Sequence, residues 1–535
     1  MTTTVEIIAD ALYQSGCRFA FGIPGGEVLS MMAALQNSGI EFNLCKHENA
    51  GGFMAEGTHH ATGAPGILLS TIGPGLVNAV NTVVNAWQDQ VPLLVISSCI
   101  DHGEAEIYTH QVFDQQQLMR TVTKGSFVIT EKSAAVVIGK AIALAKSDPP
   151  GPVHIDIPVS AADSPQPDSA RFITPAPGAM VPAEGDELSA AREQLAHAKR
   201  PIMVAGIGAM HHNAQDVIRA VCEKFNMPLI TTYKAKGIMD ENHRLSLGGH
   251  GLSPKSDKVI LPLLDQADCI VLAGYDPIEM RAGWFDPWEA KKAIELCHIP
   301  NQHGMHGAGV SYSGNVRESL LALTRDLQPA SKPWQGGEFA AARAQLEAMF
   351  ADRNTWGPHQ AIAAAQRASP ANTVVTADSG AHRILLSQMW KCHSPRGLIQ
   401  STALCTMGIS LPMAIGHRLA APDQPVLSVM GDAGLEMVMG ELATLRDLKL
   451  PIAIMVLVDQ SLALIELKQR RSQFTNLGVD FGATNFTALA KALGGVGRDI
   501  HDAETMEREV KAAYSRDRFT LLACHIEKRA YDDAF

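Results

Sequence analysis

The amino-acid sequence predicts an α/β protein made of three doubly wound domains, each with a parallel sheet. The first observation is length, because 535 residues are too many for a single hydrophobic core. The second is a series of short apolar, β-branched runs between helix-like segments, which is typical of parallel strands covered on both faces. The third is that this alternation occurs three times, with proline-rich or polar stretches between the repeats.

The first predicted domain comprises residues 1–163. Its strands are predicted at GILLSTI (66–72), PLLVISS (92–98) and VHIDIP (153–158). The following segment, 164–187, contains prolines in a polar setting, which break both helical and strand periodicity. We expect this segment to be a linker.

The second predicted domain comprises residues 188–330 and the third comprises residues 356–535. The second has predicted strands at 201–208, 228–233 and 269–275. The third has predicted strands at 373–378, 426–432, 451–459 and 519–526. Three domains of similar size and similar α/β pattern are therefore expected.

Composition restricts the class of function. With 46% hydrophobic and 19% charged residues, the chain has the composition of an ordinary globular protein. Its net charge of −11 argues against nucleic acid or an anionic membrane as a partner, since both favour a basic surface. The nine cysteines include no C-x-x-C pair, and MTTTVEIIADALYQSG does not resemble a secretory signal. We therefore expect reduced thiols and a cytoplasmic enzyme.

Two acids follow predicted strands in the third domain. GDAG (431–434) follows one strand, and Asp459 ends the next, 27 positions after Asp432. Parallel strands bring their carboxyl ends to one sheet edge, so the two carboxylates are expected to lie together beside a helix N-terminus. Such a pair describes a magnesium or calcium site that bridges to a diphosphate. The motif alone equally allows a helix cap at Asp432 and a turn residue at Asp459.

Three other stretches are less specific. AGIGAM (205–210) has two glycines after a strand but lacks the third glycine of a dinucleotide loop. The histidine pairs at 59–60 and 211–212 have no third ligand at metal spacing, so they are expected on helix surfaces. ELKQRRSQ (466–473) is most simply a solvated helix face.

The acid pair resembles the diphosphate and metal motif of thiamine diphosphate enzymes, whose usual form is Gly-Asp-Gly closing on Asn-Asn. Here Ala433 replaces a glycine, and Val458–Asp459 replaces the asparagine pair. Flavin-free catabolic acetolactate synthases, which this chain resembles most, also have Asp at that ligand position. Asp keeps an oxygen ligand for a hard cation.

Further motifs resemble those of the same family, and they follow one another along this chain in the same order as in the family. GYDPIE stands where flavin-binding homologues have an Arg-Phe-Asp-Asp-Arg pattern, so the resemblance implies a central domain without a functional FAD site. The first and third domains would bind the pyrimidine and diphosphate ends of the cofactor. The motifs are FGIPGGEV (21–28), CKHENAGGFMAEG (45–57), STIGPGLVNAV (70–80), YTHQVFDQQQLMRTVTK (108–124), GYDPIE (274–279), DSGAH (378–382) and TMGISLPMAIG (406–416).

The resemblance also implies roles for individual residues. Mg²⁺ would be held by Asp432, the Asp459 side chain and the Ser461 carbonyl. Glu48 would lie at N1′ of the pyrimidine of thiamine diphosphate, although the residues alone also allow a helix-start Glu. His110 and Gln111 would act over the thiazolium, and His110 could instead be a packed core histidine. The remaining cofactor contacts would be Pro24, Gly25, Gly380, Ala381, His382, Cys405, Met407, Gly431, Ala433, Gly434, Leu462, Leu464 and Ile465.

The implied activity is decarboxylation of a 2-oxo acid followed by carboligation, as in the conversion of two pyruvate molecules to 2-acetolactate and CO₂. After Asp459 the chain reads QSLALIELKQRR (460–471), which is more apolar than the corresponding helix of the catabolic synthases. Another donor or acceptor is therefore open: the alternatives are a simple 2-oxo acid decarboxylase, a sulfoacetaldehyde-type acetyltransferase and a diketone hydrolase. A catalytically silent binding protein is the alternative of another class.

The resemblance finally implies an oligomer. Because the pyrimidine and diphosphate ends are assigned to different domains, the family places each active site between two subunits. A homodimer is the minimum, and a homotetramer is consistent with it.

Overall fold

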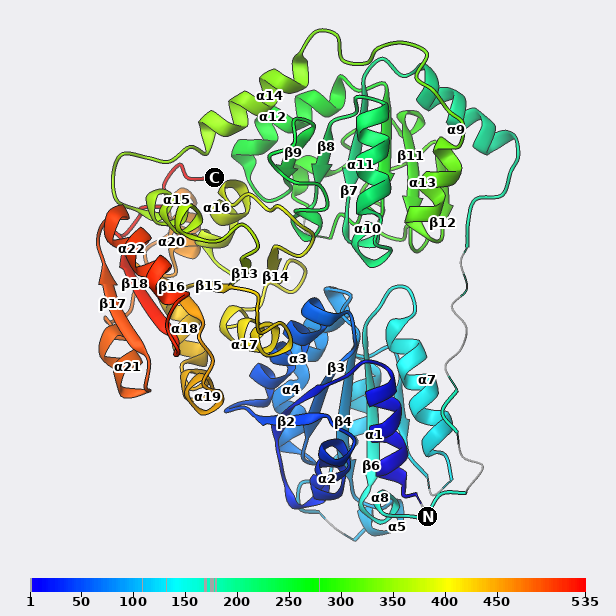
Figure 1. Ribbon diagram of the computed structural model, residues 1–535, viewed down its shortest axis with the longest axis vertical. Helices are drawn as coiled ribbons and strands as arrows, with labels where there is room; N and C mark the ends of the chain where they lie inside the picture. The colour runs from blue at the N-terminus through cyan, green and yellow to red at the C-terminus, as the bar shows by residue number, and fades with distance from the viewer. Residues whose placement is uncertain are drawn as a thin grey trace.

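The computed structural model contains three six-stranded sheets, one in each of three α/β domains (Figure 1). It describes residues 2–535 except residues 108, 131, 168–170, 174–177, 179 and 279. Tyr108 of the predicted YTHQ stretch and Glu279 of GYDPIE therefore lie outside the described residues. All neighbouring named strands in the described part run parallel. The predicted fold class is confirmed.

The first domain has the strand order β2-β1-β3-β4-β6-β5. Its strands are β1 (Phe19–Ile23), β2 (Glu41–Leu44), β3 (Gly66–Ser70), β4 (Leu93–Cys99), β5 (Ser126–Val128) and β6 (Pro152–Pro158). Its helices are α1 (Thr4–Gln14), α2 (Leu29–Asn37), α3 (Glu48–Thr62), α4 (Pro74–Gln88), α5 (His102–Ala105), α6 (Gln115–Arg120), α7 (Ala134–Lys146) and α8 (Val159–Ala162).

The middle domain has the order β12-β11-β10-β7-β8-β9, which is the order of a dinucleotide-binding fold. Its strands are β7 (Pro201–Ala205), β8 (Leu229–Thr231), β9 (Ser246–Gly249), β10 (Cys269–Ala273), β11 (Ala293–Cys297) and β12 (Val310–Ser313). Its helices are α9 (Asp186–His197), α10 (Ile207–His211), α11 (Gln215–Lys224), α12 (Pro254–Asp265) and α13 (Val316–Thr324). Helix α14 (Glu338–Met349) follows and packs against α12.

The third domain has the order β14-β13-β15-β16-β18-β17, so its topology repeats that of the first. Its strands are β13 (Val374–Ala377), β14 (Leu398–Gln400), β15 (Val426–Gly431), β16 (Ala453–Val458), β17 (Val496–Ile500) and β18 (Thr520–His525). Its helices are α15 (Pro358–Ala368), α16 (Ala381–Met389), α17 (Ser410–Ala420), α18 (Asp432–Val438), α19 (Glu441–Leu448), α20 (Ala463–Arg471), α21 (Phe486–Ala492) and α22 (Ala503–Ala513).

Local sequence explains the elements that position the site. All six residues of β16, AIMVLV, are buried, as expected for a central strand covered by helices on both faces. Helix α3 begins after His47, whose side chain accepts the Asn49 N–H, and ends at Gly63, which has the left-handed φ of 77°. Strand β16 thus delivers Asp459 to a sheet edge, and α3 begins with Glu48.

The first and third domains are held together by a close contact of α3 with α17, which lie side by side in Figure 1. A Cβ at Gly57 would lie 2.2 Å from the Met413 carbonyl oxygen, and a Cβ at Gly416 would lie 1.8 Å from the Met54 carbonyl oxygen. Glycine at both positions lets the two helix backbones approach. The two domains also share one cluster of buried apolar side chains.

The predicted surface location of the histidine pairs is wrong for His59, His60 and His211. His59 is 6% exposed, and the ring nitrogens of His60 are buried, as is Nε2 of His211. The helices that bear these rings pack at the junction of the three domains, which a single-sequence pattern does not reveal. His212 is also covered in part, since its ring lies 3.0 Å from Asp148.

Candidate active site

Asp432 and Asp459 end neighbouring strands of the third sheet. Strand β15 leads into Asp432, β16 leads into Asp459, and Gly431 pairs with Leu457 in the register of the two strands. Asp432 Oδ2 accepts the backbone N–H of Asp459 at 3.1 Å and that of Gln460 at 2.7 Å. The structure thus brings the two predicted acids to one sheet edge.

The helix-cap interpretation of Asp432 is wrong. Gly431 is the N-cap of α18, and no side chain caps this helix. Asp432 Oδ1 instead accepts the N–H of Ala433 at 2.9 Å, while Oδ2 reaches the end of β16. The turn role of Asp459 does hold, because its Oδ1 accepts the Ser461 N–H at 3.3 Å.

The electrostatics of the pair suit a divalent cation. Burial, together with the nearby charge of Asp432, raises the pKa of Asp459 to about 7. Burial also raises the pKa of Asp432. Two buried carboxylates repel each other unless a cation or a proton compensates them, and hard oxygen donors suit Mg²⁺. The described residues contain no group of three or more His, Cys, Asp or Glu side chains that could hold a metal ion.

His382 lies over the same edge. A Cβ at Gly380 would lie 2.7 Å from His382 Cε1, and a Cβ at Gly431 would lie 3.5 Å from it. The ring is 4% exposed, its Nε2 has no hydrogen-bond partner in the described residues, and burial lowers its pKa to about 4. Ala381 is the first residue of α16. Its N–H therefore lies at a helix N-terminus beside this edge of the third sheet, where such groups can bind an anion.

Asp378, which begins the predicted DSGAH motif but was given no role of its own, organises the neighbouring loop. Its two carboxylate oxygens accept the N–H of Gly408 at 3.0 Å and that of Ile409 at 3.1 Å. A Cβ at Gly434 would lie 2.0 Å from Asp378 Oδ2, so glycine is required there. The sequence signal that could have identified Asp378 is its position directly after an apolar strand, which it shares with Asp432.

Cys405 and Met407 lie in that same loop. Cys405 is exposed, has the left-handed φ of 56°, and donates its N–H to Ser401 Oγ at 3.0 Å. Met407 is half-buried. The loop therefore leaves part of the Met407 side chain accessible while Asp378 fixes the backbone that follows.

The three apolar residues predicted beyond Asp459 have different surroundings. Leu462 precedes α20 and is half-buried. Leu464 packs against the core shared by the middle and third domains, whereas Ile465 is 44% exposed. Ser461, the third predicted metal ligand, is 8% exposed.

Glu48 is the first residue of α3 and is 5% exposed. Its Oε2 accepts a hydrogen bond from Asn78 Nδ2 at 3.1 Å, and a Cβ at Gly75 would lie 3.3 Å from Oε1. The helix-start position and a buried carboxylate are therefore both present. Asn78 was not predicted, and nothing in its helical spacing marks it.

Pro24 and Gly25 follow β1, which neighbours β3 at the point where the strand order reverses. A Cβ at Gly25 would lie 2.1 Å from Thr71 Oγ1, so the turns after β1 and β3 are in close contact. Ligands of doubly wound sheets bind at such switch points.

His110 and Gln111 are both exposed, so the packed-core alternative for His110 is wrong. Gln111 has a φ of 59°, and its carbonyl oxygen would lie 2.9 Å from a Cβ at Gly73. The segment thus lies over the turn that precedes α4. Gln115, also missed from the sequence, anchors it by accepting the Gly73 N–H at 2.9 Å and donating to Asp156 at 2.8 Å.

Family models match each of the three domains. The N-terminal TPP-binding domain of thiamine pyrophosphate enzymes matches residues 2–118, the central domain matches residues 188–323, and the C-terminal TPP-binding domain matches residues 378–524. The chain belongs to the thiamine pyrophosphate enzyme family.

Similar proteins cover nearly the whole chain. A probable 2-ketoarginine decarboxylase of Pseudomonas aeruginosa is 28% identical over 97% of this chain and 93% of its own length. The acetolactate synthase isozyme 1 large subunit of Escherichia coli is 28% identical over 98% of this chain and 94% of its own length. The acetolactate synthase of Bacillus subtilis is 26% identical over 94% of this chain and 89% of its own length. This thiamine pyrophosphate enzyme is thus related to acetolactate synthases and to a 2-ketoarginine decarboxylase.

The two TPP-binding domains of this family member meet within one chain. The Thr406 hydroxyl donates to Asn81 Oδ1 at 3.2 Å, and Asn81 lies one turn beyond Asn78 on α4. Lys46 N–H donates to Glu441 Oε1 at 2.9 Å. Polar contacts therefore connect the surroundings of Glu48 to the loop that contains Met407.

Proposed function

We propose that this enzyme is a thiamine diphosphate- and Mg²⁺-dependent 2-oxo acid decarboxylase and carboligase, with formation of 2-acetolactate and CO₂ from two pyruvate molecules as its reaction. The observation that carries the proposal is the pair of buried carboxylates, Asp432 and Asp459, at the edge of the C-terminal TPP-binding domain. Family membership and the buried Glu48 support it.

The proposed division of labour follows the domains. Residues 1–163 would bind the pyrimidine, residues 356–535 would bind the diphosphate, and residues 188–330 would form a central domain that does not bind FAD. In the central domain, a Cβ at Gly274 would lie 2.2 Å from the Ala209 nitrogen, so backbone fills the space beside the AGIGAM turn. This packing supports the assignment without FAD.

The proposed Mg²⁺ ligands are the Asp432 carboxylate, the Asp459 carboxylate and the Ser461 carbonyl, completed by diphosphate oxygens and water. The raised pKa values of both acids support this, because a cation would relieve the repulsion between them. Gly431, Ala433 and Gly434 would leave the backbone free to approach the diphosphate, and Gly380 to His382 would line it.

Each catalytic side chain has a defined proposed task. Bound thiamine diphosphate would supply a carbanion-stabilising centre next to the substrate carbonyl. Glu48, held by Asn78, would hold the proton at the pyrimidine N1′ atom. His110 and Gln111, exposed over the turn after β3, would orient the substrate carboxylate and move a proton at its carbonyl oxygen. Met407 would pack against the rings of the bound cofactor and help to orient them.

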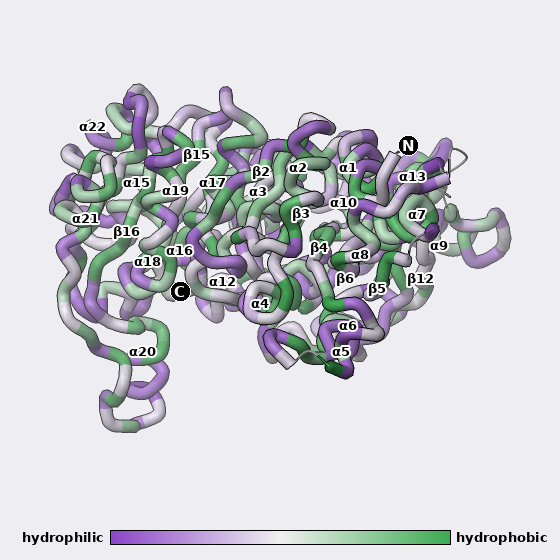
Figure 2. Tube along the Cα trace, turned by 90° about the horizontal axis from the view of Figure 1, so that it is seen from below, coloured by the Kyte–Doolittle hydropathy of each residue, from purple (hydrophilic) through white to green (hydrophobic). Residues whose placement is uncertain are grey.

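A homodimer or homotetramer with active sites between subunits is proposed on the family resemblance. The segment after α20 supports it: Figure 2 shows this region extending from the body of the molecule. Its side chains Phe474 and Leu477 are 71% and 78% exposed, respectively. Large apolar side chains on a projecting segment are typical of an interface.

Cytoplasmic location, without membrane or nucleic-acid partners, belongs to the proposal as well. Buried cysteines such as Cys17, Cys45 and Cys222 form no disulfide, which suits a reducing compartment. None of the helices in the described residues combines the length and apolar character needed to cross a bilayer.

A second candidate is decarboxylation of a longer 2-oxo acid without carboligation. It is favoured by the similarity to the 2-ketoarginine decarboxylase and by the exposed apolar Ile465 beyond Asp459, which differs from the more polar helix expected of the catabolic synthases. An apolar wall favours a longer substrate chain.

One experiment separates these functions. Purified protein is incubated with thiamine diphosphate and Mg²⁺, and with either pyruvate or 2-ketoarginine, and substrate and products are followed by NMR. Acetolactate from pyruvate supports the synthase function, and an aldehyde from 2-ketoarginine supports the decarboxylase. If neither substrate reacts although the cofactor is demonstrably bound, both proposed functions are contradicted. The enzyme would then use a different donor substrate. Failure to bind the cofactor would indicate the silent binding protein.

A further inference from the structure

An acid that has no role in the proposed reaction lies beside the turn that follows β1. Glu27 belongs to the short 3-10 helix η1 (Gly26–Val28) and is half-buried. Strands β1 and β3 end side by side there, since Ile23 pairs with Ser70 in their register. The strand order reverses at this point of the sheet, and ligands of doubly wound sheets bind in the crevice at such a point. The carboxylate of Glu27 therefore borders the candidate ligand crevice of the first domain.

Local contacts fix this carboxylate across the turn. Its Oε2 atom accepts a hydrogen bond from the Thr71 hydroxyl at 2.8 Å. A Cβ at Gly25 would lie 2.7 Å from the same oxygen, so glycine allows the Glu27 side chain to fold back over the turn. A Cβ at Gly26 would meet no atom within 4 Å, so open space adjoins the turn. The structure thus holds one carboxylate oxygen in place and leaves room for a ligand nearby.

Thr71 connects Glu27 to the proposed catalytic groups. A Cβ at Gly75 would lie 3.0 Å from Thr71 Cγ2 and 3.3 Å from Glu48 Oε1, so Thr71 lies between the two glutamates. The turn that begins at Thr71 is also the one over which Gln111 lies. Glu27 is therefore part of the surroundings in which a substrate would meet Glu48 and Gln111.

The chain itself does not compensate the charge of Glu27. Among the described residues, the Thr71 hydroxyl is the only hydrogen-bond donor to this carboxylate, and no Lys, Arg or His side chain forms an ion pair with it. An unpaired carboxylate beside a substrate crevice attracts a cation and repels a second anion. The crevice therefore favours a substrate that brings a positive charge.

We propose that Glu27 is a specificity-determining residue that selects 2-oxo acids whose side chain ends in a cation, either a guanidinium or an ammonium group. The inference rests on the proposed decarboxylation of a 2-oxo acid and specifies the donor for its second candidate function. Glu27 Oε1 would accept a hydrogen bond from the cationic end, while Thr71 holds Oε2 in place. The substrate carboxylate would remain with His110 and Gln111, so the donor would be held at both ends. Pyruvate has no such cationic end and would leave Glu27 unpaired.

Binding of unreactive analogues tests the inference without turnover. The cofactor-loaded protein is titrated in a calorimeter with 4-guanidinobutanoate and with 6-methylheptanoate, which has a similar shape but no charge at its far end. Neither compound has a 2-oxo group, so neither can be decarboxylated as a 2-oxo acid. The wild-type protein should bind the guanidino compound at least about 10-fold more tightly, the usual effect of a hydrogen bond to a charged group. Glu27→Gln should abolish this preference.

Glutamine is the informative replacement at this position, because its amide oxygen can still accept the Thr71 hydroxyl. The contact between the two turns is therefore kept, and only the negative charge is lost. Glu27→Lys reverses the charge. Measured as kcat/KM, it should change the preferred donor from 2-ketoarginine to a 2-oxo acid with a second carboxylate, such as 2-oxoglutarate.

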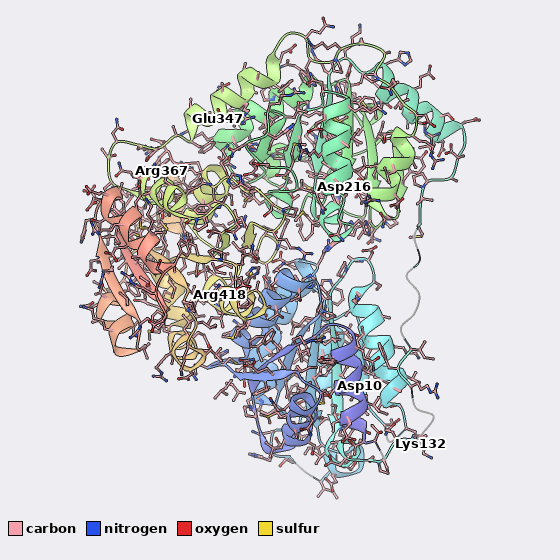
Figure 3. The ribbon with its side chains drawn as sticks, in the orientation of Figure 1. Asp10, Lys132, Asp216, Glu347, Arg367 and Arg418 are labelled. Atoms are coloured by element: carbon pink, nitrogen blue, oxygen red, sulfur yellow. The ribbon has the colours of Figure 1, made fainter. Side chains whose placement is uncertain are left out.

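A matched variant tests whether the effect is local. Asp10, labelled in Figure 3, is an exposed acid of the same domain that lies on α1 and accepts a hydrogen bond from Gln14 Nε2 at 2.5 Å. Asp10→Asn removes one negative charge from the domain but lies outside the turns that follow β1 and β3. It should therefore keep the full preference for the guanidino compound.

The binding experiment can overturn the proposal in several ways. Equal affinity of the wild-type protein for both compounds would do so, as would a preference that survives Glu27→Gln. Weaker binding of thiamine diphosphate by Glu27→Gln would also contradict it, because the carboxylate would then act on the cofactor. If Glu27→Gln loses the preference but no 2-oxo acid reacts with the wild-type protein, Glu27 keeps its role in binding and the proposed decarboxylation is contradicted.

Discussion

The first and third domains have the same strand order but present different chemistry at the reversal point of their sheets. In the third domain, Asp378, Asp432 and Asp459 all follow strands at one edge. In the first domain, the corresponding turns, after β1 and β3, contain Pro24 and Gly25 and the Thr71 to Pro74 segment. The carboxylate proposed to act there on the pyrimidine, Glu48, instead begins the helix after an edge strand.

This difference matches the two ends of the proposed cofactor. A diphosphate with its cation is highly charged, so it needs carboxylates for the cation and open backbone for the phosphate oxygens. A pyrimidine ring is nearly neutral and needs one hydrogen-bonding carboxylate in a buried place. One sheet topology thus supports both functions, because the loops rather than the strands determine the chemistry.

The largest expected effect is on the first domain. Glu48→Gln should slow exchange of the C2 proton of bound thiamine diphosphate with solvent, and should reduce turnover by about 10²–10⁴-fold, the usual contribution of acid–base catalysis. Cofactor binding should persist, because the diphosphate half is intact. NMR detection of proton exchange measures the effect without knowledge of the substrate.

Glu56→Gln is the matched control, since Glu56 is a second buried glutamate two turns further along α3. It should exchange the C2 proton at the wild-type rate. Wild-type exchange in Glu48→Gln would remove this residue from the mechanism, and equal losses in both variants would indicate a general disturbance of α3.

The second effect concerns the third domain. Asp459→Ala should weaken Mg²⁺-dependent cofactor retention by at least about 100-fold, because loss of even an outer partner of a metal costs 10–100-fold. Titration of Mg²⁺ against cofactor fluorescence quenching measures it. Asp517→Ala, which removes an exposed acid paired with Arg518, should leave the titration unchanged. An unaltered Mg²⁺ dependence of Asp459→Ala would contradict the metal assignment.

The third effect concerns the contact that joins the two domains. Gly416→Ala should lower the free energy of unfolding by about 1–3 kcal/mol, because its Cβ would lie 1.8 Å from a rigid backbone carbonyl of Met54. Gly482→Ala is the control, since nothing lies within 4 Å of the added carbon. Denaturant unfolding of both variants measures the difference. Equal stability of the two would mean that α3 and α17 do not pack as described.

The sequence predicted the interior of the sheets better than their edges. Ten of the predicted runs coincide with β3, β4, β6, β7, β8, β10, β13, β15, β16 and β18. The strands at both ends of every sheet were not predicted; these are β2, β5, β9, β12, β14 and β17. Most of these edge strands are short, and several are partly exposed, as in EFNL of β2, so they lack the continuous apolar run of a central strand. The interior strands β1 and β11 contain Gly22 and Glu295, which interrupt their runs.

The candidate site could be predicted where a residue follows a strand. Asp432 and Asp459 were found because strand ends are visible in the sequence, and Asp378 could have been found in the same way. Asn78 and Gln115 could not, because a polar residue on a helix gives no sign that it meets Glu48 or Gly73 across space. The burial of His60 and His211 was missed for a similar reason, since it depends on how three domains pack.

The last expected effect is a pH dependence of stability at the junction of the two domains, which is spread over several pH units. Burial, together with the charge of Asp89, raises the pKa of Glu56 from 4.5 to about 8. Between these values the folded state holds a proton that the unfolded state releases, so the free energy of unfolding falls as pH rises from about 5 to 8, by at most about 1.4 kcal/mol per pH unit. Glu56→Gln cannot release this proton and should flatten the profile, as measured by urea unfolding at each pH. If the wild-type profile is already flat over this range, Glu56 is ionised in the folded protein and its proton does not contribute to stability.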